Sequence, residues 1–233
     1  MPDSQLKAMP RRSKGALNRK TGLKKTRRRL RPEQAENEII EAAERFLRTH
    51  PFRALQVADL MDTTKLGRPS FYHYFKDRHD LIVRLVKKLG DEISAMNDVW
   101  FLSGSDPVAD LHEGYERIGK FWTTHGPVLR AIADAATHDR DVEKAHRALV
   151  KRFILGSAAR IRLDIERGLI APLDADATAE ALIMMSEQVL NEKLGRGSVD
   201  WRPVVDTLAT IWQRALYGAT KATRDAKATR YDR

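Results

Sequence analysis

The sequence predicts an all-α protein, in which an N-terminal three-helix unit precedes a larger helical domain. Apolar residues recur at intervals of three and four along most of the chain, and no segment shows the alternation typical of a half-buried strand. Glycine and proline interrupt this pattern at helix-length intervals. With 233 residues, 42% of them hydrophobic, the chain is long enough to bury a core. We expect about nine helices.

The first three helices are short. Residues 32–33 (Pro-Glu) are typical of a helix N-terminus, and the Thr-His-Pro of 49–51 ends that helix because a residue before proline avoids the α conformation. Apolar residues at 57–61 mark a second helix, and Gly-Arg-Pro at 67–69 opens a third. Two helices separated by so short a turn predict a helix-turn-helix unit.

The remaining helices are longer. Asp77 is a good N-cap for a fourth helix, whose apolar positions from Ile82 to Trp100 step by three or four. The dipeptide Gly126-Pro127 predicts a break between two helices. We expect the other helices at residues 107–125, 127–138, 140–168, 175–195 and 201–218.

Positive charge is concentrated at the N-terminus. The net charge is +10, and residues 1–31 hold twelve lysines and arginines against Asp3 alone, so the rest of the chain is nearly neutral. Such a block repels itself, is expected to be disordered and favours binding to polyanions. An Arg-rich leader also resembles an organelle transit peptide, but this one has only two serines. We expect an arm that binds nucleic acid.

Several classes of protein are disfavoured by what the sequence lacks. It has no cysteine, so disulfides and thiolate metal sites are excluded. The longest apolar run, 181–185, is too short for a membrane span. The seven histidines are scattered, and there is no P-loop, dinucleotide fingerprint or Gly-x-Ser-x-Gly motif. We therefore expect no enzyme, no cofactor, no membrane association, and a cytoplasmic location on the nucleoid.

The third helix divides its aromatic residues between two faces. Phe71 and Phe75 lie four apart, on one face, and are expected in the core. Tyr72 points elsewhere, with Arg68 and Ser70 nearer the helix start. A recognition helix needs this division, because its polar side must meet phosphates and base edges. Composition alone would also fit a buried aromatic helix, but the position after a turn and behind a basic arm favours DNA binding.

The segment 71–81 (FYHYFKDRHDL) resembles the end of the TetR-type DNA-binding domain, whose pattern is roughly Leu-Tyr-x-His-Phe-x-Ser-Lys-x-x-Leu. The resemblance spans residues 32–82 and places the family's phosphate-contacting tyrosine at Tyr72. The chain departs from it at 64–67, where Thr-Lys-Leu-Gly replaces Ala-Gly-Val-Ser. The resemblance implies a homodimeric, sequence-specific repressor on a palindromic double-stranded DNA operator. The expected DNA contacts are Thr64, Lys65, Arg68, Ser70, Tyr72, His73, Tyr74, Lys76 and Arg78, with Arg27, Arg28 and Arg29 of the arm.

Residues 68–72 and 211–218 resemble the subgroup of the mycobacterial ethionamide-resistance regulator. That resemblance implies a pocket for a small hydrophobic effector and a dimer interface on the last two helices, although such apolar residues are more often plain core. The subgroup's two pocket asparagines correspond to Ile183 and Ser186, so a ligand is expected to make fewer or different hydrogen bonds. The expected pocket residues are Ile118, Trp122, Phe153, Met184, Ser186 and Trp212, and the expected interface residues are Leu182, Met185, Val189, Val204, Leu208 and Ile211.

The expected organisation is a basic arm (1–31), a DNA-binding domain (32–80), a ligand-binding and dimerisation domain (81–220) and a tail (221–233). One alternative remains open at this point. The arm alone could attach the protein to nucleic acid regardless of sequence, as a nucleoid-type protein does. Discrimination between an operator and random DNA separates the two hypotheses.

Overall fold

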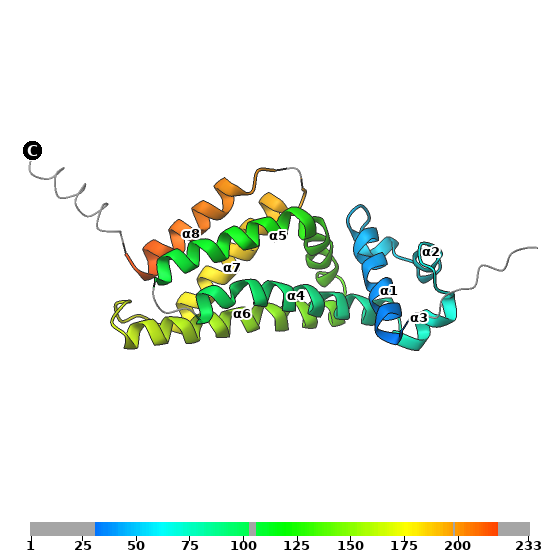
Figure 1. Ribbon diagram of the computed structural model, residues 1–233, viewed down its shortest axis with the longest axis horizontal. Helices are drawn as coiled ribbons and strands as arrows, with labels where there is room; N and C mark the ends of the chain where they lie inside the picture. Colours follow the sequence, from blue (N-terminus) through cyan, green and yellow to red (C-terminus); the bar gives the residue numbers. More distant parts are fainter. Residues whose placement is uncertain (1–30, 103–105, 198, 219–233) are drawn as a thin grey trace, which may run out of the picture.

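The computed structural model of the protein describes residues 31–102, 106–197 and 199–218, and within them the chain is all-α, as predicted. The tail and Arg27, Arg28 and Arg29 lie outside the described residues. The described part has eight α-helices and one short 3₁₀ helix (Figure 1). These are α1 (Pro32–Leu47), η1 (Phe52–Ala54), α2 (Val57–Asp62), α3 (Arg68–Tyr74), α4 (Arg78–Leu102), α5 (Pro107–Ala136), α6 (Arg140–Glu166), α7 (Ala175–Leu194) and α8 (Arg202–Leu216).

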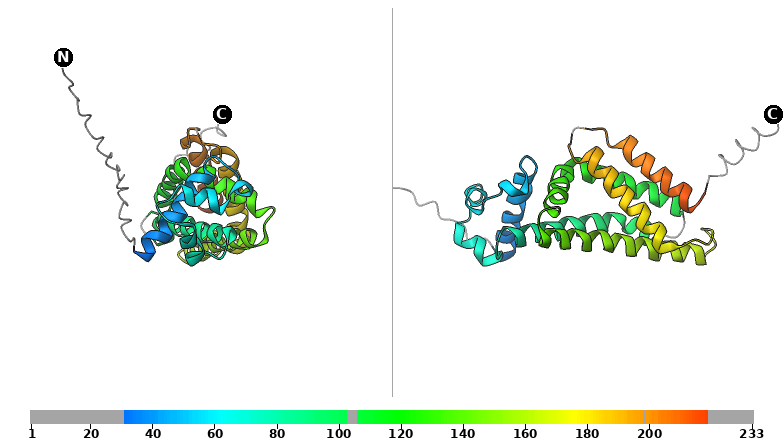
Figure 2. Two further views of the ribbon diagram at one scale, coloured as in Figure 1. Left: turned by 90° about the vertical axis from the view of Figure 1, so that its right-hand side faces the viewer. Right: turned by 180° about the vertical axis from the view of Figure 1, so that it is seen from behind.

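Helices α1, α2 and α3 form one end of an elongated molecule (Figure 1). Helix α4 leaves this end and runs along α6, while α5, α7 and α8 cover the other side of the α4–α6 pair (Figures 1 and 2). The long α4 therefore belongs to both parts of the molecule. No helix in the described part is long and apolar enough to cross a membrane.

The core of the three-helix unit contains the two phenylalanines of α3. Phe71 is 0% exposed and Phe75 is 1% exposed, in one cluster with Leu60 of α2. Leu81 and Leu85, from the start of α4, are fully buried in the same cluster. The predicted inward face of α3 is confirmed. Full burial of a phenylalanine contributes about 2–3 kcal/mol, so this face fixes how α3 is turned.

Aspartates begin four of the long helices. Asp77, the predicted N-cap of α4, accepts hydrogen bonds from the backbone nitrogens of His79 (2.9 Å) and Asp80 (3.0 Å), which confirms it. The same geometry recurs at α5, α6 and α7, where the caps are Asp106, Asp139 and Asp174. Each cap satisfies backbone donors that a helix start would otherwise leave unpaired, and contributes about 1 kcal/mol.

The predicted break at Gly126-Pro127 is wrong. Helix α5 continues from Pro107 to Ala136 with Pro127 inside it, and it bends in its second half (Figure 1). A proline removes one backbone donor and bends a helix without ending it where packing holds both halves. Val128 and Ile132, beyond the proline, are buried. Because the two helices expected on either side of Pro127 form one, the described part has eight α-helices where nine were expected.

Helix α5 packs closely against α7 at Gly126. A Cβ atom added to Gly126 would lie 2.6 Å from the backbone oxygen of Leu194, at the end of α7. A backbone carbonyl cannot rotate away as a flexible side chain can. The absence of a side chain at this position therefore sets the distance between the two helices.

Gly126→Ala should destabilise the protein by about 1–3 kcal/mol, because the helices must separate to admit the methyl group. Urea unfolding followed by circular dichroism measures this. Gly156→Ala is the matched control, since its Cβ would meet Phe101 no closer than 3.4 Å. That change should be neutral or stabilising by up to about 1 kcal/mol. Equal effects of the two substitutions would contradict the close approach.

Candidate DNA-binding surface and ligand cavity

The outward face of α3 carries hydrogen-bonding side chains. Tyr72 is 65% exposed, although Phe71 beside it is completely buried. Arg68 and His73 are also exposed, and Ser70 is half-buried. Arg68 approaches Asp62 at 3.9 Å, but both side chains are more than half exposed, and such pairs contribute little. The guanidinium and the phenol are therefore available to an external partner.

The turn between α2 and α3 is built by a threonine. Thr64 Oγ1 donates to the Met61 carbonyl at 2.8 Å and accepts from the backbone nitrogen of Leu66 at 3.2 Å. The backbone nitrogen of Lys65 donates to Glu38 Oε1 on α1 at 2.7 Å, and the Lys65 side chain is exposed. Thr64 thus has an internal structural role, whereas Lys65 presents its ammonium group beside α3.

Two other expected DNA contacts have internal roles. The Arg78 guanidinium donates to the Leu55 carbonyl at 3.1 Å and to the Arg53 carbonyl at 3.4 Å, and lies 5.2 Å from the Phe52 ring centre. It therefore holds the segment around η1. Tyr74 is half-buried and packs against the core. Of the remaining expected contacts, Lys76 is exposed just after α3.

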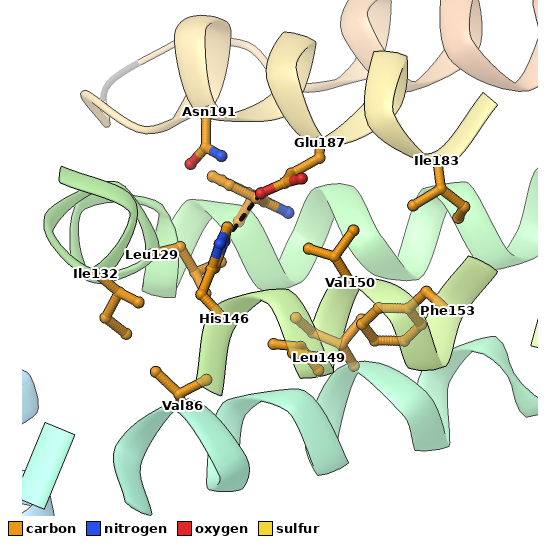
Figure 3. Close-up of a pocket in the computed structure, with 12 residues that line it drawn as sticks. Val86, Leu129, Ile132, His146, Leu149, Val150, Phe153, Ile183, Glu187 and Asn191 are labelled. Carbon is orange, nitrogen blue, oxygen red and sulfur yellow. Dashed lines mark ion pairs between the residues drawn. The ribbon is translucent and has the colours of Figure 1, made fainter. Parts of the chain in front are cut away.

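A cavity of about 90 Å³ lies between α4, α5, α6 and α7 (Figure 3). Trp122 and Phe153, two of the expected pocket residues, line it. The lining is otherwise mostly aliphatic, as in sites for apolar ligands. The other lining residues are Val86, Ile93, Leu129, Ile132, His146, Leu149, Val150, Ile183, Glu187 and Asn191.

The other four expected pocket residues do not line this cavity. Ser186 is buried between Tyr115 and Trp212, where it hydrogen-bonds the tyrosine hydroxyl at 2.8 Å and accepts from the indole nitrogen at 3.0 Å. These three side chains form a polar cluster within the core. Met184 follows the cavity residue Ile183 by one position, which turns it away on the helix, and it is 55% exposed. Ile118 is half-buried and packs against the core.

The expected interface residues are divided between core and surface. Leu208 is 1% exposed and Leu182 is 7% exposed, so both pack within their own chain. Met185, Val189 and Val204 are half-buried against the same core. Ile211 is 39% exposed. The helical spacing of these residues therefore identified a stripe that is mostly buried within the chain. The exposed surface of α7 and α8 lies beside this stripe.

Three polar residues of the cavity were not anticipated. His146 Nε2 lies 2.9 Å from Glu187 Oε1, which joins α6 to α7, and Asn191 lies one turn beyond Glu187 (Figure 3). A signal was present in the sequence, because Ile183, Glu187 and Asn191 are spaced by four and share one helix face. A glutamate and an asparagine on a face that begins with isoleucine are unusual for plain core.

A buried carboxylate joins the three-helix unit to the larger bundle. Glu44 of α1 is 6% exposed, and its Oε1 lies 2.9 Å from both Arg48 and His125, a residue of α5. Lys88 of α4 lies 3.6 Å from Oε2. The hydrogen bond from His125 is the largest of the effects that lower the pKa of Glu44 to about 2. A second pair, between His79 and Asp139, ties the start of α4 to α6.

Comparison with known proteins decides between the classes of helical protein that this arrangement allows. Residues 39–85 match the tetR family of bacterial regulatory proteins, and residues 111–218 match the C-terminal domain of the transcriptional regulator EthR. The chain belongs to the TetR family. It is 28% identical to the HTH-type transcriptional regulator EthR of Mycolicibacterium smegmatis over 199 residues, which cover 82% of this chain and 91% of that protein. EthR of Mycobacterium tuberculosis (strain H37Rv) is also 28% identical, over 211 residues that cover 85% and 95%.

Solved structures of TetR-family regulators share the fold. A putative regulator from Syntrophomonas wolfei superimposes with a TM-score of 0.70 at 11% identity, covering 79% of this chain and 96% of that one. One from Mesorhizobium loti gives 0.65 at 17% identity, covering 80% and 98%. This TetR-family protein is therefore a DNA-binding transcriptional regulator and not an enzyme. No group of three histidine or acidic side chains that could hold a metal occurs in the described part.

The Glu44 cluster predicts a stability difference that depends on pH. Because folding lowers the pKa of Glu44 from its ordinary 4.5 to about 2, its ionised form stabilises the protein fully above pH 4.5. That contribution, about 3 kcal/mol, is lost as pH falls from 4.5 towards 2. The unfolding free energies of the wild type and Glu44→Gln, measured by urea titration, should therefore differ most near pH 6 and converge only near pH 2 and below. Glu41→Gln, an exposed neighbour on α1, is the control and should show no such convergence.

Proposed function

We propose that this regulator is a repressor that binds a palindromic operator as a homodimer and leaves it when a small hydrophobic effector occupies the cavity. The proposal rests on the different environments of the two faces of α3. Two buried phenylalanines hold the helix, so that Arg68 and Tyr72 face outwards from one end of the molecule. Arginine can pair with a guanine edge and tyrosine can donate to a phosphate oxygen.

A dimer would place two such α3 helices on adjacent turns of the major groove. The surfaces of α7 and α8 are the candidates for the interface. They expose Met184 and Ile211 at 55% and 39%, which are large apolar side chains for a solvent-facing position. The buried Leu182 and Leu208 would support this surface from beneath.

Helix α4 offers a physical route from the cavity to the DNA-binding unit. Val86 and Ile93 of α4 line the cavity, whereas Leu81 and Leu85 lie in the core shared with α3. The cavity of about 90 Å³ is smaller than the roughly 150 Å³ that holds a benzene ring. An effector larger than this volume would push its walls apart. Displacement of α4 would then change the distance between the two α3 helices of a dimer.

The basic arm is assigned an accessory role in this proposal. In the sequence, Arg27, Arg28 and Arg29 closely precede Pro32, where α1, the first helix of the DNA-binding unit, begins. Basic N-terminal arms add contacts to the DNA backbone or minor groove without reading sequence by themselves. The arm should therefore raise affinity for all DNA, and α3 should supply discrimination.

Substitutions on α3 should weaken operator binding selectively. After selection of binding sites from random duplex DNA, Arg68→Ala should cost about 1–3 kcal/mol on the recovered operator and little on random DNA. Tyr72→Phe should cost about 1 kcal/mol through one lost hydrogen bond. Fluorescence anisotropy measures both. Arg147→Ala, an exposed arginine on α6, is the matched control and should bind as the wild type does.

Deletion of residues 1–30 separates the regulator from a sequence-independent binder. The deletion should lower affinity for operator and random DNA alike, and should flatten the salt dependence by about 0.9 in log–log slope for each phosphate that the arm neutralises. If it abolishes binding while Arg68→Ala and Tyr72→Phe change nothing, the protein is a sequence-independent binder of the nucleoid type.

A side chain that fills the cavity should block the effector. Val150→Phe adds a ring to the lining, so that apolar ligands found by a thermal-shift screen should no longer raise the melting temperature or release operator DNA. Leu155→Phe, on the same helix but 54% exposed, should respond to ligand as the wild type does. Effector release that survives Val150→Phe would place the effector site elsewhere.

A further inference from the structure

The polar groups of the cavity lie at one end of it. Glu187 and Asn191 of α7 and His146 of α6 are close to Leu129, whereas Phe153 and Ile183 lie at the other end (Figure 3). A ligand in this cavity would therefore meet an apolar wall along most of its length and hydrogen-bonding atoms at one terminus. Such an arrangement fixes orientation and selects chemistry.

The buried side-chain atom that lacks a hydrogen-bond partner at this end is an acceptor. Asn191 Oδ1 is buried and has no hydrogen-bond partner among the described residues. The Glu187 carboxylate can accept several hydrogen bonds, and its Oε1 lies 2.9 Å from His146 Nε2 as an ion pair. A buried oxygen without a partner is costly, and a ligand that donates to it removes the cost.

The charges at this end disfavour an anion. None of the lining residues in the described chain is a lysine or an arginine, and His146 is already paired with Glu187. Guanidinium groups lie outside the lining: Arg130 approaches the backbone oxygen of Asn191 at 3.5 Å, and with Arg48 and Arg196 it lines the adjoining groove, which also holds Asp134 and Glu192. A ligand carboxylate would lie against the Glu187 carboxylate, whereas an ammonium group would share that carboxylate with His146.

The polar end also faces the second hollow of the molecule. Asn191 lines both the cavity and a groove of about 710 Å³ between the end of α1, α5 and α7. A ligand inserted with its apolar part towards Phe153 keeps its polar group at Asn191, beside the more hydrated groove. This orientation spares the polar group from complete loss of water contact.

From these contacts we infer that the cavity selects small apolar molecules that carry a hydrogen-bond donor at one end, above all amines, and rejects carboxylates. The inference rests on the proposed effector cavity and adds the chemical class of its ligand. Glu187 and Asn191 are the specificity-determining residues. His146 positions the Glu187 carboxylate through their ion pair.

Four small molecules with similar carbon chains test this selection. They are n-butylamine (a cationic donor), n-butanol (a donor and acceptor), 2-butanone (an acceptor only) and butyrate (an anion), chosen small because of the cavity's volume. The melting temperature of the full chain at matched pH and ionic strength should rise in the order butyrate, 2-butanone, n-butanol, n-butylamine. Calorimetry should give a dissociation constant for the amine about tenfold or more below that for the ketone.

Glu187→Gln keeps the size of the side chain and removes its charge. It should abolish the preference for n-butylamine over n-butanol and reduce the discrimination against butyrate. Glu180→Gln, an exposed position on the same helix, should leave the order unchanged. Because the order among the four probes is measured on the unaltered protein, it stands even if the substituted chain folds poorly.

Two results overturn the inference, and they are distinguishable. If n-butanol and 2-butanone bind but n-butylamine binds no better than butyrate, the selection for donors is wrong while the effector cavity stands. If none of the four probes stabilises the protein, and Val150→Phe behaves as the wild type does towards every ligand tested, both the selection and the effector cavity are wrong.

Discussion

The rest of the structure depends on one helix that runs through both parts of the molecule. Leu81 and Leu85 in the first turns of α4, and Leu89 and Trp100 in its later turns, are all buried in one continuous core that also holds the phenylalanines of α3. A continuous α-helix transmits displacement along its axis because its backbone hydrogen bonds resist bending. A change in packing around one part of α4 therefore alters the packing around its other part.

The charges around Glu44 complement this apolar connection. Arg48, Lys88 and His125 come from three different parts of the chain, and all three approach one carboxylate. A single buried carboxylate would be unfavourable, and its partners offset the cost only while the helices keep their positions. Rotation of α1 against α5 must therefore lengthen the contact between Glu44 and His125.

The sequence predicted the DNA-binding end of the molecule better than the cavity. Short helices, caps and the inward phenylalanines follow from local rules that concern residues three or four apart, so α1 to α4 and the outward Tyr72 could be anticipated. The helix expected to end at Gly126-Pro127 continues, because tertiary packing on both sides of Pro127 overrides the local signal. Residues such as His146 and Glu187 meet only when α6 and α7 are placed side by side, which periodicity cannot indicate.

Periodicity also cannot indicate which of the apolar residues of α7 and α8 lie in the core and which lie at the surface. A stripe of apolar residues identifies a buried face, but not whether the neighbour that buries it belongs to the same chain. Leu182 and Leu208 are covered by their own chain, and Ile211 remains at the surface. Ser186 illustrates the converse, since a polar residue expected in a ligand site is satisfied by Tyr115 and Trp212.

The hydrogen bonds of Arg78 bear on how mutagenesis of this protein should be interpreted. Its guanidinium bridges two carbonyls and covers an aromatic ring within the DNA-binding unit. Truncating it would leave those carbonyls to water and loosen the segment before α2, and this alone would lower DNA affinity. A scan of basic residues that scored binding alone would not distinguish this loss of internal support from the loss of a DNA contact. Parallel measurements of stability distinguish basic residues that support the fold from basic residues that contact DNA.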